Sequence, residues 1–142
     1  MKRSGKRNLI LTLLAALMLL IIVITVAGKQ SGMLLDSEEK RREYIATLGI
    51  SLSDKAPDIR NIVIPSEFSE VYNRYNELQK EAGFDLWKYR GEYAVQYSYT
   101  ATGYENDSVK VTLILYKERL IGGDIGSTRL DGFMTGLVPV EY

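Results

Sequence analysis

The sequence of 142 residues contains no cysteine and no histidine. Without cysteine, disulfide bonds, thiolate metal sites and cysteine nucleophiles are excluded. Without histidine, the chain lacks the commonest zinc ligand and the usual proton acceptor at neutral pH. The routes to enzyme chemistry that remain are carboxylates and an activated serine, threonine or lysine. The length allows one domain of ordinary size, and 46% hydrophobic with 25% charged residues is the balance of a chain that folds.

The formal net charge of zero hides an asymmetry along the chain. Residues 1–29 carry five basic residues and no acidic one, whereas residues 30–142 carry the other 13 basic residues and all 18 acidic ones, a balance of −5. A short basic head and an acidic body argue against nucleic acid as the partner of the body.

The one long hydrophobic run covers residues 9–27 and holds no charge. As a helix it would be about 28 Å long, close to the roughly 30 Å of a bilayer's hydrocarbon core. The apolar part of a cleaved signal peptide is usually only about 7–15 residues long, which favours a retained anchor. Cleavage after Ala27 is the alternative, because Thr25-Val26-Ala27 is an acceptable small-residue site.

The charges beside this run predict its orientation. Lys2, Arg3, Lys6 and Arg7 precede it, and basic residues stay on the cytoplasmic side of a membrane. We therefore expect a single-pass protein of the cell membrane with a cytoplasmic tail (1–8), an anchor in the lipid bilayer (9–27), a linker (28–35) and an extracytoplasmic domain (36–142).

Residue periodicity in 36–142 predicts an α+β domain. One helix is expected over 36–48, with Asp36 as its N-cap, and a second is expected to follow Ser66 as its N-cap. The inward stripe of the second helix has a spacing of three and four: Phe68, Val71, Tyr72, Tyr75, Leu78 and Ala82.

Alternation of apolar and polar residues predicts the strands. A short edge strand is expected over 59–64, followed by three strands over 92–102, 109–116 and 120–125. The links between the last three are short, so these strands must be antiparallel. The expected fold is therefore two helices packed on one face of a mainly antiparallel sheet, a three-strand meander plus one short edge strand.

Two groups of residues are candidates for chemistry. Ser98 and Lys110 lie on neighbouring predicted strands and could form a Ser–Lys pair. Asp124 and Asp131 lie in the glycine-rich stretch IGGDIGSTRLDGF and could act as paired carboxylates or bind a hard cation. Chance pairings are common on a polar sheet face, and GGD more often marks a bulge or turn. The sequence thus assigns no catalytic, cofactor-binding or metal-binding residue.

Tyrosines offer a third candidate surface. Tyr93, Tyr97 and Tyr99 lie on one face of a predicted strand and could form a carbohydrate or peptide platform. Because Val95 and Ala101 share this face, we expect it to belong to the core.

Three segments carry a resemblance to a known family. IVIPSEF, YNELQKEAGFDLWKYRGE and YKERLIGGDIGSTRLDGFMTGL occur in this order. They resemble a domain family of unknown function in membrane-anchored exported proteins of clostridia-like Gram-positive bacteria. The resemblance implies a one-pass anchor and an exported domain, and it implies no activity, cofactor or site residue.

These patterns favour a non-enzymatic binding or protein-interaction module at the cell surface. Its expected partner is a cell-surface or membrane protein, or a peptide. The alternative is a membrane-tethered hydrolase that uses carboxylates or the Ser–Lys pair.

The orientation can be tested on intact cells. Because the basic head precedes the uncharged run, protease added outside should remove the domain that follows it. The measurement is an immunoblot against a C-terminal tag. A domain that survives until the membrane is permeabilised would contradict the orientation, and mature chains that begin near Gly28 would show cleavage.

Overall fold

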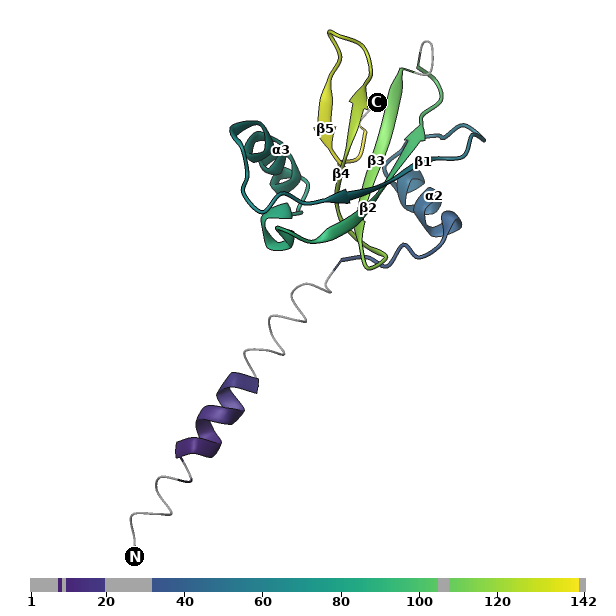
Figure 1. The fold of residues 1–142 in the computed structure, drawn as a ribbon. Coiled ribbons are helices and arrows are strands. Elements are labelled where there is room, and N and C mark those ends of the chain that lie inside the picture. The colour runs from purple at the N-terminus through teal and green to yellow at the C-terminus, as the bar shows by residue number, and fades with distance from the viewer. Residues whose placement is uncertain (1–7, 9, 20–31, 105–107, 141–142) are drawn as a thin grey trace, which may run out of the picture. The chain divides into compact units, whose positions relative to one another are not determined.

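The computed structural model describes residues 8, 10–19, 32–104 and 108–140, and the chain divides into two units, Met1–Ser31 and Gly32–Tyr142 (Figure 1). In the first unit residues 10–19 are helical with exposed side chains. Among the described residues, no helix has both the length and the apolar character needed to cross a membrane. Leu9 and residues 20–27 of the predicted anchor lie outside the described residues, so the anchor stays a prediction.

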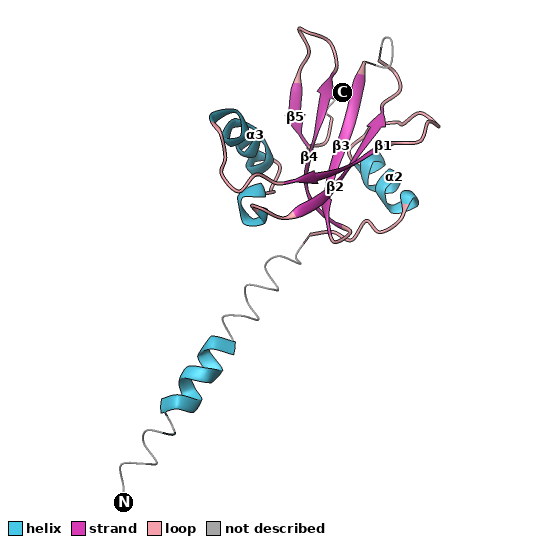
Figure 2. Cartoon of the chain, in the orientation of Figure 1, coloured by secondary structure: helices cyan, strands magenta, loops and turns pink. Residues whose placement is uncertain are grey.

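The second unit is an α+β domain built on one antiparallel sheet, which confirms the predicted fold class (Figure 2). In its described part the sheet has five strands in the order β1-β2-β3-β4-β5. Their bounds are Asp58–Val63 for β1, Tyr93–Thr100 for β2, Val109–Tyr116 for β3, Arg119–Ser127 for β4 and Met134–Gly136 for β5. The edge position of β1 is as predicted. The predicted count of four strands is wrong, because the three residues of β5 are too few to show an alternation.

Two α-helices and one 3₁₀ helix accompany the sheet in the described residues: α2 (Glu38–Thr47), α3 (Glu70–Glu81) and η1 (Leu86–Tyr89). The predicted N-caps Asp36 and Ser66 are both wrong. The hydroxyl of Ser37 accepts from the Lys40 amide to cap α2, and the hydroxyl of Ser69 accepts from the Tyr72 amide to cap α3. In each case the helix begins later than predicted, and the serine directly before its first residue supplies the cap.

The two α-helices lie on opposite faces of the sheet, which contradicts the expectation of a single covered face (Figure 1). Ile45 of α2 belongs to a buried cluster with Tyr99, Val111 and Leu113. The other face has its own cluster, in which Phe68, Tyr72 and Tyr75 pack against these buried residues: Ile64, Leu86, Tyr89, Ala94, Ile114, Tyr116 and Ile121. Both alternating sets of β3 contain apolar side chains, and a strand of that kind requires cover on both sides.

Helix α3 approaches the sheet where glycines leave space. A side-chain Cβ at Gly122 would lie 2.7 Å from Gln79 Oε1, and one at Gly136 would lie 2.6 Å from the Leu78 carbonyl oxygen. Gln79 is buried there, and its Oε1 accepts from the Gly123 amide at 2.8 Å. The helix thus buries a polar residue outside the predicted stripe, while Val71 of that stripe is 77% exposed.

The burial of these helices predicts a contrast between two substitutions. Ile45→Ala empties a fully buried position, so it should lower the free energy of unfolding by roughly 2–5 kcal/mol. Val71→Ala changes an exposed helix position and should alter it by no more than about 0.5 kcal/mol. Urea unfolding followed by circular dichroism measures both, and equal effects would contradict the helix faces described above.

Candidate functional site

Helix α3 and η1 cover only part of the sheet face on which they pack. On β2 the side chains of this face change from Ala94, which is buried, to Gln96, Ser98 and Thr100. On β3 the same face runs from Ile114 through Thr112 to Lys110, by the register that pairs Gln96 with Ile114 and Thr100 with Lys110. One end of the face is therefore apolar and covered, and the other is polar.

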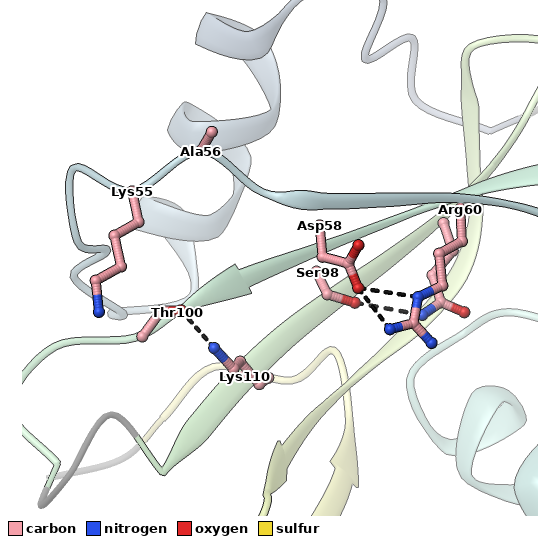
Figure 3. Close-up of a pocket in the computed structure, with 8 residues that line it drawn as sticks. Lys55, Ala56, Asp58, Arg60, Ser98, Thr100 and Lys110 are labelled. Atoms are coloured by element: carbon pink, nitrogen blue, oxygen red, sulfur yellow. Dashed lines mark hydrogen bonds and ion pairs between the residues drawn. The ribbon is translucent and has the colours of Figure 1, made fainter.

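A shallow depression of about 430 Å³ lies over the polar end of this face (Figure 3). It is lined from β1, β2, β3 and the loop before β1 by Lys55, Ala56, Asp58, Arg60, Gln96, Ser98, Thr100 and Lys110. The volume is at the lower end of the range of ligand pockets, roughly 300–1,000 Å³. We call these eight residues the polar depression.

Hydrogen bonds hold the floor of the polar depression. Lys110 Nζ donates to Thr100 Oγ1 at 2.6 Å, and Gln96 Nε2 donates to Ser98 Oγ at 3.3 Å. Ser98 Oγ also lies 3.3 Å from Thr112 Oγ1, across the β2–β3 pair. A floor whose side chains bond to one another on a sheet is held in place before any ligand arrives.

The predicted Ser98–Lys110 pair shares the polar depression, but its two side chains are bonded to different partners. Ser98 stands opposite Thr112, and Lys110 stands opposite Thr100. The ammonium group accordingly contacts the threonine hydroxyl rather than the serine. A Ser–Lys nucleophile needs the amine within hydrogen-bond reach of the serine oxygen, and this arrangement does not supply that contact.

The charge of the polar depression is opposite to that of the domain. Lys55, Arg60 and Lys110 contribute three positive charges, and Asp58 contributes one negative charge. The carboxylate of Asp58 is bound to its neighbour on the strand, since Arg60 Nε and Nη2 lie 2.9 and 2.7 Å from Asp58 Oδ2. The polar depression is therefore a basic surface on a domain whose net charge is negative.

Asp124 lies at the border between the covered and the open part of this face. It stands opposite Thr112 on β3, is only 9% exposed, and accepts a hydrogen bond from the Tyr75 hydroxyl at 2.8 Å. Burial raises the pKa of Asp124 above its ordinary value, although the bond from Tyr75 acts in the opposite direction. The pKa of Tyr75 is raised by burial and by the Asp124 charge. This pair joins α3 to the centre of the sheet.

The structure separates the two predicted carboxylates. Asp131 is exposed in the loop between β4 and β5, where Arg129 Nε lies 3.7 Å from its Oδ1. Across the described residues, no group of three or more carboxylates is placed to hold a metal ion. The stretch GGD lies inside β4, beside the bulge where the β3–β4 register shifts between Ile114 and Leu115, as the bulge interpretation predicts.

The tyrosine face belongs largely to the core, as predicted, with one exception. Tyr99 is 1% exposed and donates to Glu38, and the Arg41 guanidinium lies 4.1 Å from the centre of the Tyr97 ring. Tyr93, by contrast, is 79% exposed at the start of β2. Arg41 belongs to the basic run Lys40-Arg41-Arg42, and nothing in that run indicates which of its side chains is buried.

The sequence identified Ser98 and Lys110 but missed the other members of the polar depression. Arg60 lies on the predicted strand over 59–64 and Lys55 in the segment before it, and only the antiparallel pairing of Arg60 with Gln96 places that strand beside β2. In the sequence, the one sign of this depression is the set of uncharged polar residues at alternate positions over 96–100.

Comparison with known protein families, with curated proteins and with solved structures gives no match to this chain. The resemblance to a family of membrane-anchored exported proteins therefore stays a prediction.

The burial of Asp124 predicts a pH dependence. Because its pKa is raised in the folded state, the folded state binds this proton more tightly, and the free energy of unfolding should rise as pH falls through the raised pKa. Asp124→Asn removes the buried charge and keeps an oxygen that can accept from Tyr75. The variant should be more stable than the parent at pH 7, and the gap should close by about pH 3, below the ordinary aspartate pKa of about 3.9, where the carboxyl group is mostly protonated in both states.

Chemical denaturation at several pH values measures this difference. Asp131→Asn, which removes the same charge at an exposed position, is the matched control. An Asp124→Asn protein less stable than its parent at pH 7 would show that the fold requires the ionised carboxylate.

Proposed function

We propose that this chain is a single-pass, membrane-anchored binding module that uses the polar depression to hold an acidic peptide segment of a cell-surface protein. The observation that carries the proposal is the gathering of Lys55, Arg60 and Lys110 around a floor of hydroxyl and amide groups. Residues 9–27 are the proposed anchor, with residues 1–8 in the cytoplasm and the domain outside.

Charge and shape both support an acidic ligand. Carboxylates accept hydrogen bonds from lysine and arginine more strongly than neutral groups do. The alternating hydroxyls of Ser98 and Thr100 add donors between the cations. An open depression on a sheet face suits a segment that lies across it, whereas a small substrate that must be shielded from water needs an enclosed cavity.

The negative charge of the rest of the domain supports binding of an acidic segment at the polar depression rather than elsewhere on the surface. Residues 30–142 carry five more acidic than basic residues, so an acidic segment is repelled by most of the surface and attracted at the polar depression. Binding of this kind weakens as salt screens the charges. The anchor supports the same function, because it keeps the module beside other membrane and surface proteins.

The proposal is tested with the full chain in detergent and a fluorescent hexaglutamate peptide. Fluorescence anisotropy should show saturable binding that weakens with added salt, and a hexalysine peptide should not bind. Lys110→Gln should weaken binding by about tenfold to a hundredfold, because a hydrogen bond to a charged group contributes about 1.5–3 kcal/mol and each 1.4 kcal/mol is a factor of ten.

Lys88→Gln is the matched control, since it removes the same charge from an exposed residue of η1 outside the polar depression. Equal weakening by Lys110→Gln and Lys88→Gln would mean that the peptide responds to the net charge only. Absence of hexaglutamate binding at low salt would overturn the proposal.

A further inference from the structure

The outer edge of β1 is the longer of the two open sheet edges. β1 has six residues, whereas β5 at the other edge has three. Within the described part of the chain, no strand pairs with the outer side of β1. Five of its six side chains are exposed, and the sixth, Ile62, is partly buried. Such an edge offers backbone groups to any strand that can align with it.

Exposed apolar side chains lie beside this edge. Ile59 is 58% and Val63 is 52% exposed, and Val63 stands opposite Tyr93, which is 79% exposed. Ile59 stands opposite Tyr97, so these side chains share the sheet face on which α2 packs. On this face of the open edge, Asn61 is thus flanked by two exposed β-branched residues.

The backbone direction at this edge follows from the residue after β1. The Ile64 amide donates to the Glu92 carbonyl at 2.9 Å, and the Ile64 carbonyl accepts from the Gly91 amide at 2.8 Å, so both Ile64 groups point toward the β2 side. Backbone groups alternate along a strand. The amides and carbonyls of Ile59, Asn61 and Val63 therefore point outward.

We propose that β1 pairs antiparallel with β1 of a second copy of this chain, about a two-fold axis at Asn61. The outward groups of Asn61 then bond to those of Asn61 in the other copy. Ile59 stands opposite Val63 of the second copy, and Val63 opposite its Ile59. Every outward amide and carbonyl of the strand finds a partner, and the exposed aliphatic side chains meet on one face.

Other registers satisfy fewer of these groups. An axis at Arg60 would place two arginines directly opposite each other at a close pair, about 4.5 Å between Cα atoms. An axis at Ile59 would pair only three residues of each strand. A register shifted by a single residue would place side chains on the α2 face of one copy opposite side chains on the other sheet face of the second copy. An axis at Ile62 would set Ile59 opposite Pro65, which has no amide to donate. Only the axis at Asn61 pairs all three outward residues of β1 with one another.

This pairing would extend the sheet across two molecules and place both polar depressions on the same side. Asp58 and Arg60 of each copy line the polar depression from β1, next to the shared edge. The dimer does not depend on the proposed ligand, but it would give two such sites to one ligand chain.

Because the chain has no cysteine, a cysteine introduced by substitution is its only thiol, and cross-linking through that thiol tests the pairing. In the proposed dimer the two copies of residue 61 lie about 5.5 Å apart at Cα, as in any hydrogen-bonded antiparallel pair. The two copies of residue 59 are four residues apart along the strands, about 14 Å. A short bis-maleimide whose span lies between these separations should join Asn61→Cys chains.

The full chain in detergent is used, and cross-linked dimer is measured on a denaturing gel. Asn61→Cys should give about tenfold more dimer than Ile59→Cys or Val63→Cys alone, whereas a mixture of the last two should cross-link, because their residues stand opposite each other. Equal yields at all three positions would show random encounter or pairing elsewhere in the chain. That outcome, or no dimer from Asn61→Cys, would overturn the proposal.

A second variant tests the backbone bonds. Asn61→Pro removes an outward amide, and proline is tolerated on an edge strand where the amide faces solvent. Circular dichroism should show an unchanged fold, and sedimentation should show loss of the dimer that the parent forms. A dimer of unchanged strength in a folded Asn61→Pro protein would also overturn the pairing. Hexaglutamate binding by the monomeric variant would leave the proposed function intact.

Discussion

The close approach of α3 to the glycines of β4 and β5 is the contact on which the arrangement of this domain depends. Gly122 and Gly136 have no side chain where the helix passes, and a Cβ at either position would be within 2.7 Å of an α3 atom. At this distance Gln79 reaches the Gly123 amide and Tyr75 reaches Asp124. These polar contacts add to the apolar packing of Tyr72 and Tyr75 in holding the helix to the sheet.

The position of α3 divides one sheet face into a covered apolar part and an open polar part. Over Ala94, Ile114 and Ile121 the helix and η1 exclude water and complete a core. Beyond the helix the same strands carry hydroxyl, amide and cationic groups, and those groups line the polar depression. Asp124 stands at the border, buried and bonded to the helix. The candidate site is thus the part of a rigid sheet that the helix does not reach.

The opposite face leaves a different feature uncovered. Helix α2 packs over Tyr99 and Val111, and the buried Arg41 binds the Tyr99 hydroxyl and the Leu35 carbonyl at 3.0 Å each. This cover stops before the sheet edge, so Ile59, Val63 and Tyr93 remain exposed. The helix on each face covers only part of the sheet, so one face leaves the polar depression open and the other leaves apolar side chains beside β1 exposed.

The sequence by itself determined the fold class, β2 to β4, the edge position of β1 and the core character of most tyrosines, because alternation and short links are local signals. It also located Ser98 and Lys110. Only the tertiary structure decided that the helices lie on opposite faces and that Lys110 contacts Thr100. It alone placed Arg60 beside Gln96 and buried Asn76 and Gln79. These features depend on register and on space left by glycines, and both arise between segments that are distant in the chain.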